Sequence, residues 1–240
     1  MIKKLLSFFQ QKPAPKPPQK SGKSQNAKSK STKPRPKVES TRIGELGEHK
    51  INIQLDQLPK ECKSLSDLML PNPKSRTGYS QVDHLVISPY CLFVIETKNY
   101  NGEIKGGRSD QQWTVSNRFK MYNPLRQNYG HIKAIESLIE GVPALRSVSM
   151  ISFTMRCRFS IDPELRKIQS DELIVYDVEL SEFISRKLLR LKTENPEPLF
   201  SDEQIQNIYD QLSRANIADP EVRKLHVEKI TSNKKSMSNS

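Results

Sequence analysis

The chain has 240 residues, a formal net charge of +12 and a hydrophobic fraction of 35%, which suffices for one medium-sized domain and extensions that need not fold. Its three cysteines, Cys62, Cys91 and Cys157, are far apart and odd in number, so composition excludes a disulfide framework and a cysteine-based zinc site. The longest apolar run is far shorter than the roughly 20 residues of a spanning helix, and we expect a soluble, cytoplasmic protein.

The positive charge is concentrated at the N-terminus. Residues 1–40 contain eleven lysines and arginines and one acidic residue, Glu39, so this segment carries +10 of the +12. The other 200 residues carry only +2. The basic composition therefore does not by itself indicate a nucleic-acid-binding surface on the folded domain.

The N-terminal segment divides into a leader and a linker. Residues 1–10, MIKKLLSFFQ, form a short amphipathic leader whose apolar run is too short for a signal peptide, which needs about 7 to 15 apolar residues. Residues 11–39 are rich in Lys, Pro and Ser and bury almost nothing, which predicts a disordered linker. Two alternatives stay open for residues 1–37: a solvated extension, or attachment to an anionic membrane surface, such as the inner face of a bacterial membrane.

The folded domain is expected over residues 40–230, with a flexible tail at 231–240. Its first helix is expected to begin near Ser40 or Thr41, whose hydroxyls can cap it, and apolar residues then recur at helical spacing. Further helices are predicted at 123–141, 180–190 and 201–215, and strands at 64–70, 111–117, 147–157 and 171–177, besides one central hairpin. This order predicts a mixed α/β domain with helices flanking one central sheet.

Two of these helices carry terminal signals. Pro124 occupies a position where a first-turn proline is tolerated, and Gly141 with Pro143 is expected to stop the same helix. Ser201 and Gln204 have the spacing of a capping box at the start of the helix over 201–215.

The central hairpin, VDHLVISPYCLFVIETK, places charged residues at its open end. If Pro89 and Tyr90 form a two-residue connection, Asp83 lies directly across from Glu96. Side chains alternate along a strand, so Glu96 and Lys98 lie on one face, and directly opposed residues share a face. The register decides this prediction, because a slip of one residue would turn one carboxylate away.

Two opposed carboxylates need compensation, since like charges across strands are destabilising. A divalent cation held by carboxylate oxygens would provide it, with Lys98 beside it to contact a phosphate or orient a water. Carboxylates, a divalent ion and a lysine are the groups that phosphodiester hydrolysis requires. The simpler alternative is an exposed cluster in which Lys98 bridges both acids and contributes little energy.

Around these residues the chain resembles the nuclease-related domain (NERD) family, over roughly residues 40–230. The resembling segments occur in the order GELGEHKI, QVDHLVI, LFVIETKNYNGEIKG, NPLRQNYGHIKAI, FSDEQIQNIYDQL and KLHVEKI. That family is similar to the PD-(D/E)XK nucleases, in which a restriction-endonuclease-like mixed central sheet, flanked by helices, carries an Asp and a Glu-x-Lys motif. The resemblance implies a nuclease that uses Mg²⁺ or Mn²⁺, acts on DNA rather than RNA and needs no small-molecule cofactor.

The family's site residues carry over to five positions. Asp83 matches the motif aspartate, Glu96 the metal-binding glutamate and Lys98 the catalytic lysine. Glu48 matches an acid on the first helix that contacts the metal directly or through water, and Glu45 is the alternative match for that acid. Gln127 matches a polar position that faces the same site.

Plainer interpretations accompany these assignments. Gln127 can instead be a capping or solvent-exposed amide, and His131, which shares its helix face, can simply be packed or solvated. Trp113 and Tyr100 can stack on bases, although their strand patterns favour packing in the sheet. The alternative function is a catalytically silent nucleic-acid-binding or membrane-tethered interaction module with the same fold.

Overall fold

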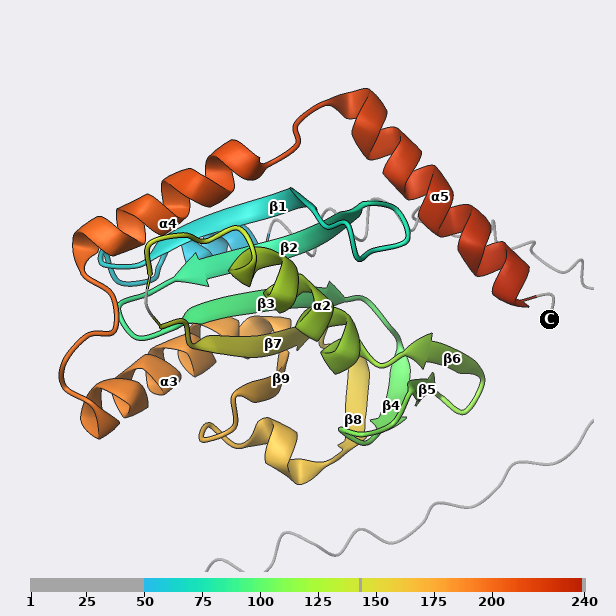
Figure 1. Ribbon diagram of the computed structural model, residues 1–240. Coiled ribbons are helices and arrows are strands. Elements are labelled where there is room, and N and C mark those ends of the chain that lie inside the picture. Colours follow the sequence, from blue (N-terminus) through green and yellow to red (C-terminus); the bar gives the residue numbers. More distant parts are fainter. Residues whose placement is uncertain (1–49, 143, 239–240) are drawn as a thin grey trace, which may run out of the picture. The chain divides into compact units, whose positions relative to one another are not determined.

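The computed structural model describes residues 50–142 and 144–238, and of residues 233–238 only the backbone (Figure 1). The chain divides into two units, residues 1–37 and 38–240, and all described residues belong to the second unit. The leader, the linker, and Glu45 and Glu48 lie outside the described residues. Within the described ranges, no helix is both long enough and apolar enough to cross a membrane.

The described part of the second unit is mixed α/β, as the order of predicted elements indicates. Its strands are β1 (Lys63–Pro71), β2 (Tyr79–Ile87), β3 (Leu92–Lys98), β4 (Gly102–Gly106), β5 (Gln112–Val115), β6 (Phe119–Tyr122), β7 (Ser147–Phe153), β8 (Cys157–Ile161) and β9 (Glu172–Tyr176). Its helices are α2 (Pro124–Glu136), α3 (Leu180–Glu194), α4 (Asp202–Ala215) and α5 (Pro220–Ser238), with short 3₁₀ turns at Pro163–Arg166 and Asp177–Glu179. Residues 50–55 are also helical.

The strands form two mixed sheets rather than the single central sheet that the pattern predicts. The five-stranded sheet has the order β1-β2-β3-β7-β9 and the four-stranded sheet the order β6-β5-β4-β8. The segment over 147–157, predicted as one strand, is divided by a turn in which Cys157 N donates to Thr154 O at 3.3 Å. As a result β7 pairs with β3 in the first sheet and β8 pairs with β4 in the second. Strand β4 is short and glycine-flanked, so its local pattern is that of a loop.

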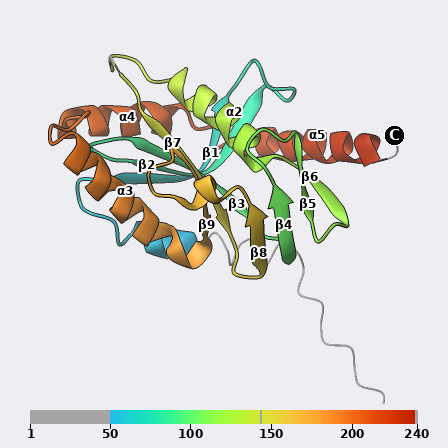
Figure 2. The same ribbon diagram turned by 90° about the horizontal axis from the view of Figure 1, so that it is seen from below.

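Helices cover both faces of the five-stranded sheet (Figure 2). On one face, Ile51 and Leu55 of the first helix and Ile184 of α3 pack against β3, β7 and β9. On the other face, Ile135 of α2 and Ile208 of α4 pack against β1, β2 and β3. The first sheet is therefore buried on both sides, which explains the continuous apolar runs of β2 and β3.

A third apolar cluster joins the second sheet to the first. Trp113 of β5, fully buried, packs with Ile104 of β4, Leu125 of α2 and Phe153 of β7, and Tyr100 lies against this cluster. The interpretation that Trp113 and Tyr100 pack in the sheet is confirmed. A buried Trp113 has no free face on which a base could stack.

Helix α2 begins where the sequence indicates and ends earlier. Pro124 occupies its first turn, and the Asn123 side chain caps it by accepting a hydrogen bond from Leu125 N at 2.9 Å. The helix ends at Glu136 instead of running to Gly141, and its last turn tightens where Leu138 N donates to Ile135 O at 3.0 Å. At α4, the predicted capping box of Ser201 and Gln204 is present.

Helix α5 is absent from the order of elements that the sequence predicts. It is anchored to the first sheet by an ion pair between Arg223 Nη1 and Asp67 Oδ2 at 2.6 Å, where Asp67 lies on β1. The His226 ring also packs edge-on against Tyr79 of β2, with the ring centroids 6.1 Å apart. These contacts join residues about 150 positions apart, which local periodicity cannot reveal.

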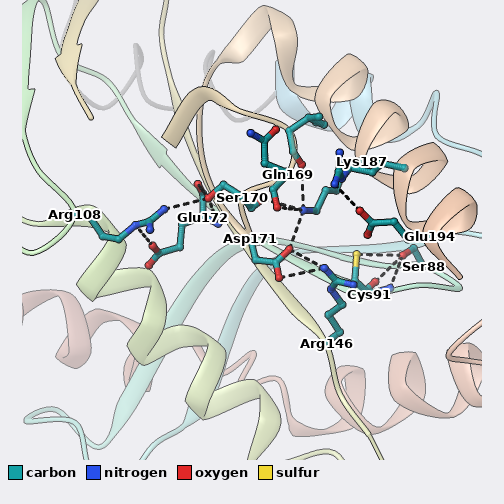
Figure 3. A network of polar contacts seen from close by, with 12 residues as sticks. Ser88, Cys91, Arg108, Arg146, Gln169, Ser170, Asp171, Glu172, Lys187 and Glu194 are labelled. Carbon is teal, nitrogen blue, oxygen red and sulfur yellow. Dashed lines mark hydrogen bonds and ion pairs between the residues drawn. The ribbon is translucent and has the colours of Figure 1, made fainter. Parts of the chain in front are cut away.

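A buried lysine joins α3 to the turn that precedes β9 (Figure 3). Lys187 is 1% exposed, and its ammonium donates to the backbone carbonyls of Ile168, Gln169 and Ser170 at 3.1, 3.2 and 2.9 Å. It also pairs with Asp171 at 2.8 Å. Four acceptors satisfy the ammonium, so we interpret this network as structural support for the sheet.

We predict that Lys187→Met lowers the free energy of unfolding by about 2 to 4 kcal/mol, because three partly buried carbonyls lose their donor and Asp171 loses its ion-pair partner. Urea denaturation followed by circular dichroism measures the change. The matched control is Arg186→Met, which removes an exposed cation from the adjacent position and should cost less than about 1 kcal/mol. Equal losses in the two variants would contradict the structural role of Lys187.

Candidate functional site

The central hairpin has the register on which the predicted site depends. His84 pairs with Ile95 and Ile87 with Leu92, so paired residue numbers sum to 179, as predicted. Ser88 N donates to Cys91 O at 3.1 Å and closes the two-residue connection. Glu96 and Lys98 therefore lie on the sheet face that α2 covers, where Val94 also packs.

The two strands separate just where the acidic residues begin. The last backbone pair is His84 with Ile95, and Asp83 does not continue the ladder. Its carboxylate instead accepts hydrogen bonds from Thr97 N at 2.7 Å and Thr97 Oγ1 at 2.6 Å through Oδ2. The backbone donor of Thr97 is thus satisfied by a side chain, and among the described residues Oδ1 of Asp83 accepts no hydrogen bond.

Strict alternation of faces fails at the same point. Val82 and Leu85 belong to the same apolar cluster although they are an odd number of positions apart, with Asp83 and His84 between them. On the neighbouring strand, Asp67 lies between the paired residues Ser66 and Leu68 with a left-handed φ of 52°. The sequence pattern predicts an uninterrupted strand here, whereas the backbone is irregular where the Asp83 carboxylate accepts from Thr97.

Glu96, Lys98 and Gln127 form a closed hydrogen-bonded triangle. Lys98 Nζ donates to Glu96 Oε1 at 2.5 Å and to Gln127 Oε1 at 3.0 Å. Gln127 Nε2, from α2, donates to the same Glu96 oxygen at 2.7 Å. Glu96 is only 5% exposed, and Lys98 contacts Glu96 without bridging to Asp83. The alternative of an exposed cluster bridged by Lys98 is therefore wrong, and Gln127 is not a solvent-exposed amide.

His131 lies one helical turn from Gln127 and completes the wall beside Glu96. Its Nε2 is 3.4 Å from Glu96 Oε2, and the residue is 8% exposed. Burial lowers the pKa of His131 to about 4, so the imidazole is neutral near pH 7. Its Nε2 also lies 3.5 Å from Gln127 Nε2, and Nδ1 has no hydrogen-bond partner among the described residues. His131 is thus packed rather than solvated.

The Glu96 carboxylate is electrostatically unfavourable in its ionised form. Burial raises the pKa of Glu96 to about 7, and the charge of Asp83 adds to the rise. Lys98 and the hydrogen bond from Gln127 act in the opposite direction but do not cancel it. A cation bound nearby would favour the ionised form, because its positive charge would offset the free-energy cost of burying the ionised carboxylate.

These groups line one cavity of about 530 Å³. From the predicted site it brings together Asp83, Glu96, Lys98 and Gln127, together with His131. It also includes residues to which the sequence assigned no role: the β1–β2 loop (Ser75, Arg76 and Thr77), the start of β2 (Tyr79, Ser80 and Gln81), and His226 and Ile230 of α5. The KLHVEKI segment carries a family resemblance, but no local pattern in it indicates that it reaches the site.

The residues present fit a hard divalent cation with some of its ligands still to be supplied. Mg²⁺ is commonly held by one or two carboxylates while it retains waters, and Asp83 and Glu96 offer this donor set. Among the described residues, no group of three or more His, Cys, Asp or Glu side chains could hold a metal ion. Glu48, predicted as the supporting acid, lies outside the described residues.

Comparison with known proteins places the chain in a family. The family model described as "Nuclease-related domain" (NERD) matches residues 43–154, which include Asp83, Glu96, Lys98 and Gln127. An uncharacterized protein of Bacillus anthracis is 32% identical over 189 residues, which cover 77% of this chain and 82% of that protein. No solved structure matches the chain at a significant level. The chain belongs to the nuclease-related domain family.

We predict that Glu96→Gln changes how stability depends on pH when divalent cations are removed by chelation. A raised folded-state pKa means that ionising Glu96 opposes folding. The stability that protonated Glu96 contributes to the folded state is fully present below about pH 4.5 and is lost as the pH rises through 7. The stability of Glu96→Gln relative to the natural chain should rise by roughly 2 to 3 kcal/mol from about pH 5 to about pH 8.

Denaturant unfolding across this pH range measures the effect. The matched control is Glu164→Gln, which neutralises an exposed glutamate that pairs with Lys167 on the protein surface. Its difference from the natural chain should stay nearly flat. A flat difference for Glu96→Gln as well would mean that the folded protein leaves this carboxylate with an ordinary pKa.

Proposed function

We propose that the chain is a metal-dependent nuclease that hydrolyses phosphodiester bonds of DNA, built on a restriction-endonuclease-like core of the PD-(D/E)XK type. Membership in the nuclease-related domain family supports a nuclease-related function in general. The observation that carries the finer proposal is the convergence of Asp83, Glu96 and Lys98 on one cavity.

The proposed roles follow from the contacts. Asp83 and Glu96 would hold Mg²⁺ or Mn²⁺, with Glu48 as a further ligand. The bound cation would neutralise phosphate charge and lower the pKa of a bound water. Gln127 holds Glu96 and Lys98 in fixed orientation through two hydrogen bonds. This leaves Lys98 positioned to orient or deprotonate the attacking water at the cavity wall.

The polar contacts within the cavity have a consequence for metal binding. Both Lys98 and Gln127 donate to Glu96 Oε1, so a cation that binds this oxygen competes with two hydrogen bonds. The Glu96 Oε2 atom has only the longer contact with His131. Partial release of Lys98 from Glu96 would free its ammonium for the phosphate or the attacking water.

The basic N-terminal segment would add affinity without specificity. Its charge of +10 over residues 1–40 suits contact with phosphate groups of nucleic acid, and such contact weakens as salt rises. The same charge and the apolar leader would also suit an anionic membrane surface, which is the alternative partner for residues 1–37. A catalytically silent module that only binds DNA is the alternative function for the folded unit.

We predict chelator-sensitive cleavage of DNA, lost in Asp83→Ala and Lys98→Ala. Purified protein is incubated with plasmid and linear DNA, with Mg²⁺ or with chelator, and the products are separated on gels. Each substitution should reduce the cleavage rate by about 100-fold or more, because each removes a group that acts on the reacting phosphate or water.

The matched control is Lys105→Ala, which removes an exposed cation of β4 that lies outside the cavity and should leave the rate within about twofold. DNA binding without Mg²⁺-dependent cleavage would favour the silent module. Equal rates in all three variants would show that cleavage does not use this site.

We further predict that removing residues 1–37 weakens DNA binding by at least about tenfold at low salt and flattens its dependence on salt. Fluorescence anisotropy at several salt concentrations measures both quantities. Flotation with anionic and with neutral vesicles tests the membrane alternative in parallel. Vesicle binding that requires anionic lipid and residues 1–37, together with unchanged DNA affinity, would assign the segment to membranes instead.

A further inference from the structure

Helix α5 contributes to the cavity although it lies outside the residues that the family model matches. The match ends at residue 154, whereas His226 and Ile230 line the same cavity as Asp83 and Glu96. The ion pair between Arg223 and Asp67 holds the helix against β1 at this place. The Asp and Glu-x-Lys residues therefore do not account for the cavity wall that α5 forms.

His226 is a buried polar group without a partner. The residue is 4% exposed, and neither ring nitrogen has a hydrogen-bond partner among the described residues. Its ring forms a T-shaped contact with the Tyr79 ring at an interplanar angle of 84°. A neutral imidazole carries one donor and one acceptor, and native proteins rarely leave both unused in a buried position. A ligand in the cavity would supply the hydrogen-bond partner that the His226 ring lacks.

Arg76 is presented to the same cavity by an ordered turn. Asn72 N donates to Gly78 O at 2.7 Å, and Ser75 Oγ donates to Tyr79 O at 2.7 Å, so the β1–β2 loop has a defined conformation. The Arg76 side chain is exposed and forms no ion pair with the acids of the described residues. An exposed guanidinium without an ion-pair partner is suited to bidentate contact with a phosphate.

The end of β2 that His226 contacts lies away from the carboxylates. Tyr79, which His226 contacts, precedes Asp83 by four residues, or about 13 Å at the usual strand rise of about 3.3 Å per residue. A single phosphate cannot reach both places. Two phosphates of one polynucleotide strand can, since successive phosphates follow one another every few ångströms.

We propose that His226 and Arg76 form an anion-binding subsite that holds a second phosphate of the polynucleotide strand whose scissile phosphate lies at Asp83 and Glu96. This inference rests on the proposed nuclease function and deepens it, because it assigns residues to a phosphate of the strand other than the scissile one. Both residues are positioning residues and do not touch the reacting atoms.

The test uses the full chain in chelator, so that no cleavage occurs, and follows the imidazole signals by NMR during titration with an oligodeoxythymidine. The chain has four histidines, and the signal missing from His226→Phe identifies His226. Titration at elevated salt suppresses contact with the basic N-terminal segment. We expect a saturable shift of the His226 signal, while His84, which is buried outside the cavity, should not move.

Matched variants then test Arg76. Arg76→Met should raise the oligonucleotide concentration at the midpoint by about fivefold or more, because a charged phosphate contact is lost. Lys224→Met removes a cation from α5 on a side that lines a different cavity, and it should shift the midpoint by less than about twofold. In cleavage assays His226→Phe, which retains the ring against Tyr79, should raise KM and leave kcat within about twofold.

The outcomes separate this inference from the proposed activity. A His226 response without Mg²⁺-dependent cleavage would overturn the activity and leave the subsite standing. Cleavage by the natural chain combined with an unmoved His226 signal would overturn the subsite alone. Equal midpoint shifts in Arg76→Met and Lys224→Met would show that charge in general, and not this position, holds the strand.

Discussion

The burial of the Glu96 carboxylate is the constraint on which the rest of the site depends. An almost fully enclosed acid with a pKa near 7 opposes folding when ionised, unless donors and positive charge are brought to it. Lys98 supplies the charge from the same strand, but Gln127 can reach Glu96 only if α2 crosses that end of β3. Asn128 secures this crossing by donating to Val94 O and Ser149 Oγ, each at 2.8 Å.

The second constraint is the early end of the β2–β3 ladder. Backbone pairing stops at His84 and Ile95, and the Asp83 carboxylate takes over the donor that a continued ladder would have used. Separation of the strands opens space beside Glu96 without leaving the Thr97 amide unsatisfied, so the cavity adds no unpaired buried backbone donor there. The same hydrogen bonds hold Asp83 beside Thr97, so both acids line one cavity.

Elements beyond the family match support and enlarge this centre. Helix α3 covers the opposite face of the sheet, and its buried Lys187 ties the turn before β9 to the helix. Helix α5 adds a cavity wall with chemistry unlike that of the acidic centre, since His226 and the nearby Arg76 are suited to anions. The proposed cation-binding centre and the proposed phosphate-binding wall would together suit a polyanionic substrate.

The sequence alone determined the features that depend on neighbouring residues. The two-residue connection at Pro89 and Tyr90 set the register, the period of two placed Glu96 and Lys98 on one face, and Pro124 marked the start of α2. Tertiary structure decided the division into two sheets, the interrupted alternation at Asp83, the burial that raises the pKa of Glu96, and the arrival of α5 at the cavity. Each of these arises from packing between segments far apart in the chain, and periodicity within a short window carries no information about such contacts.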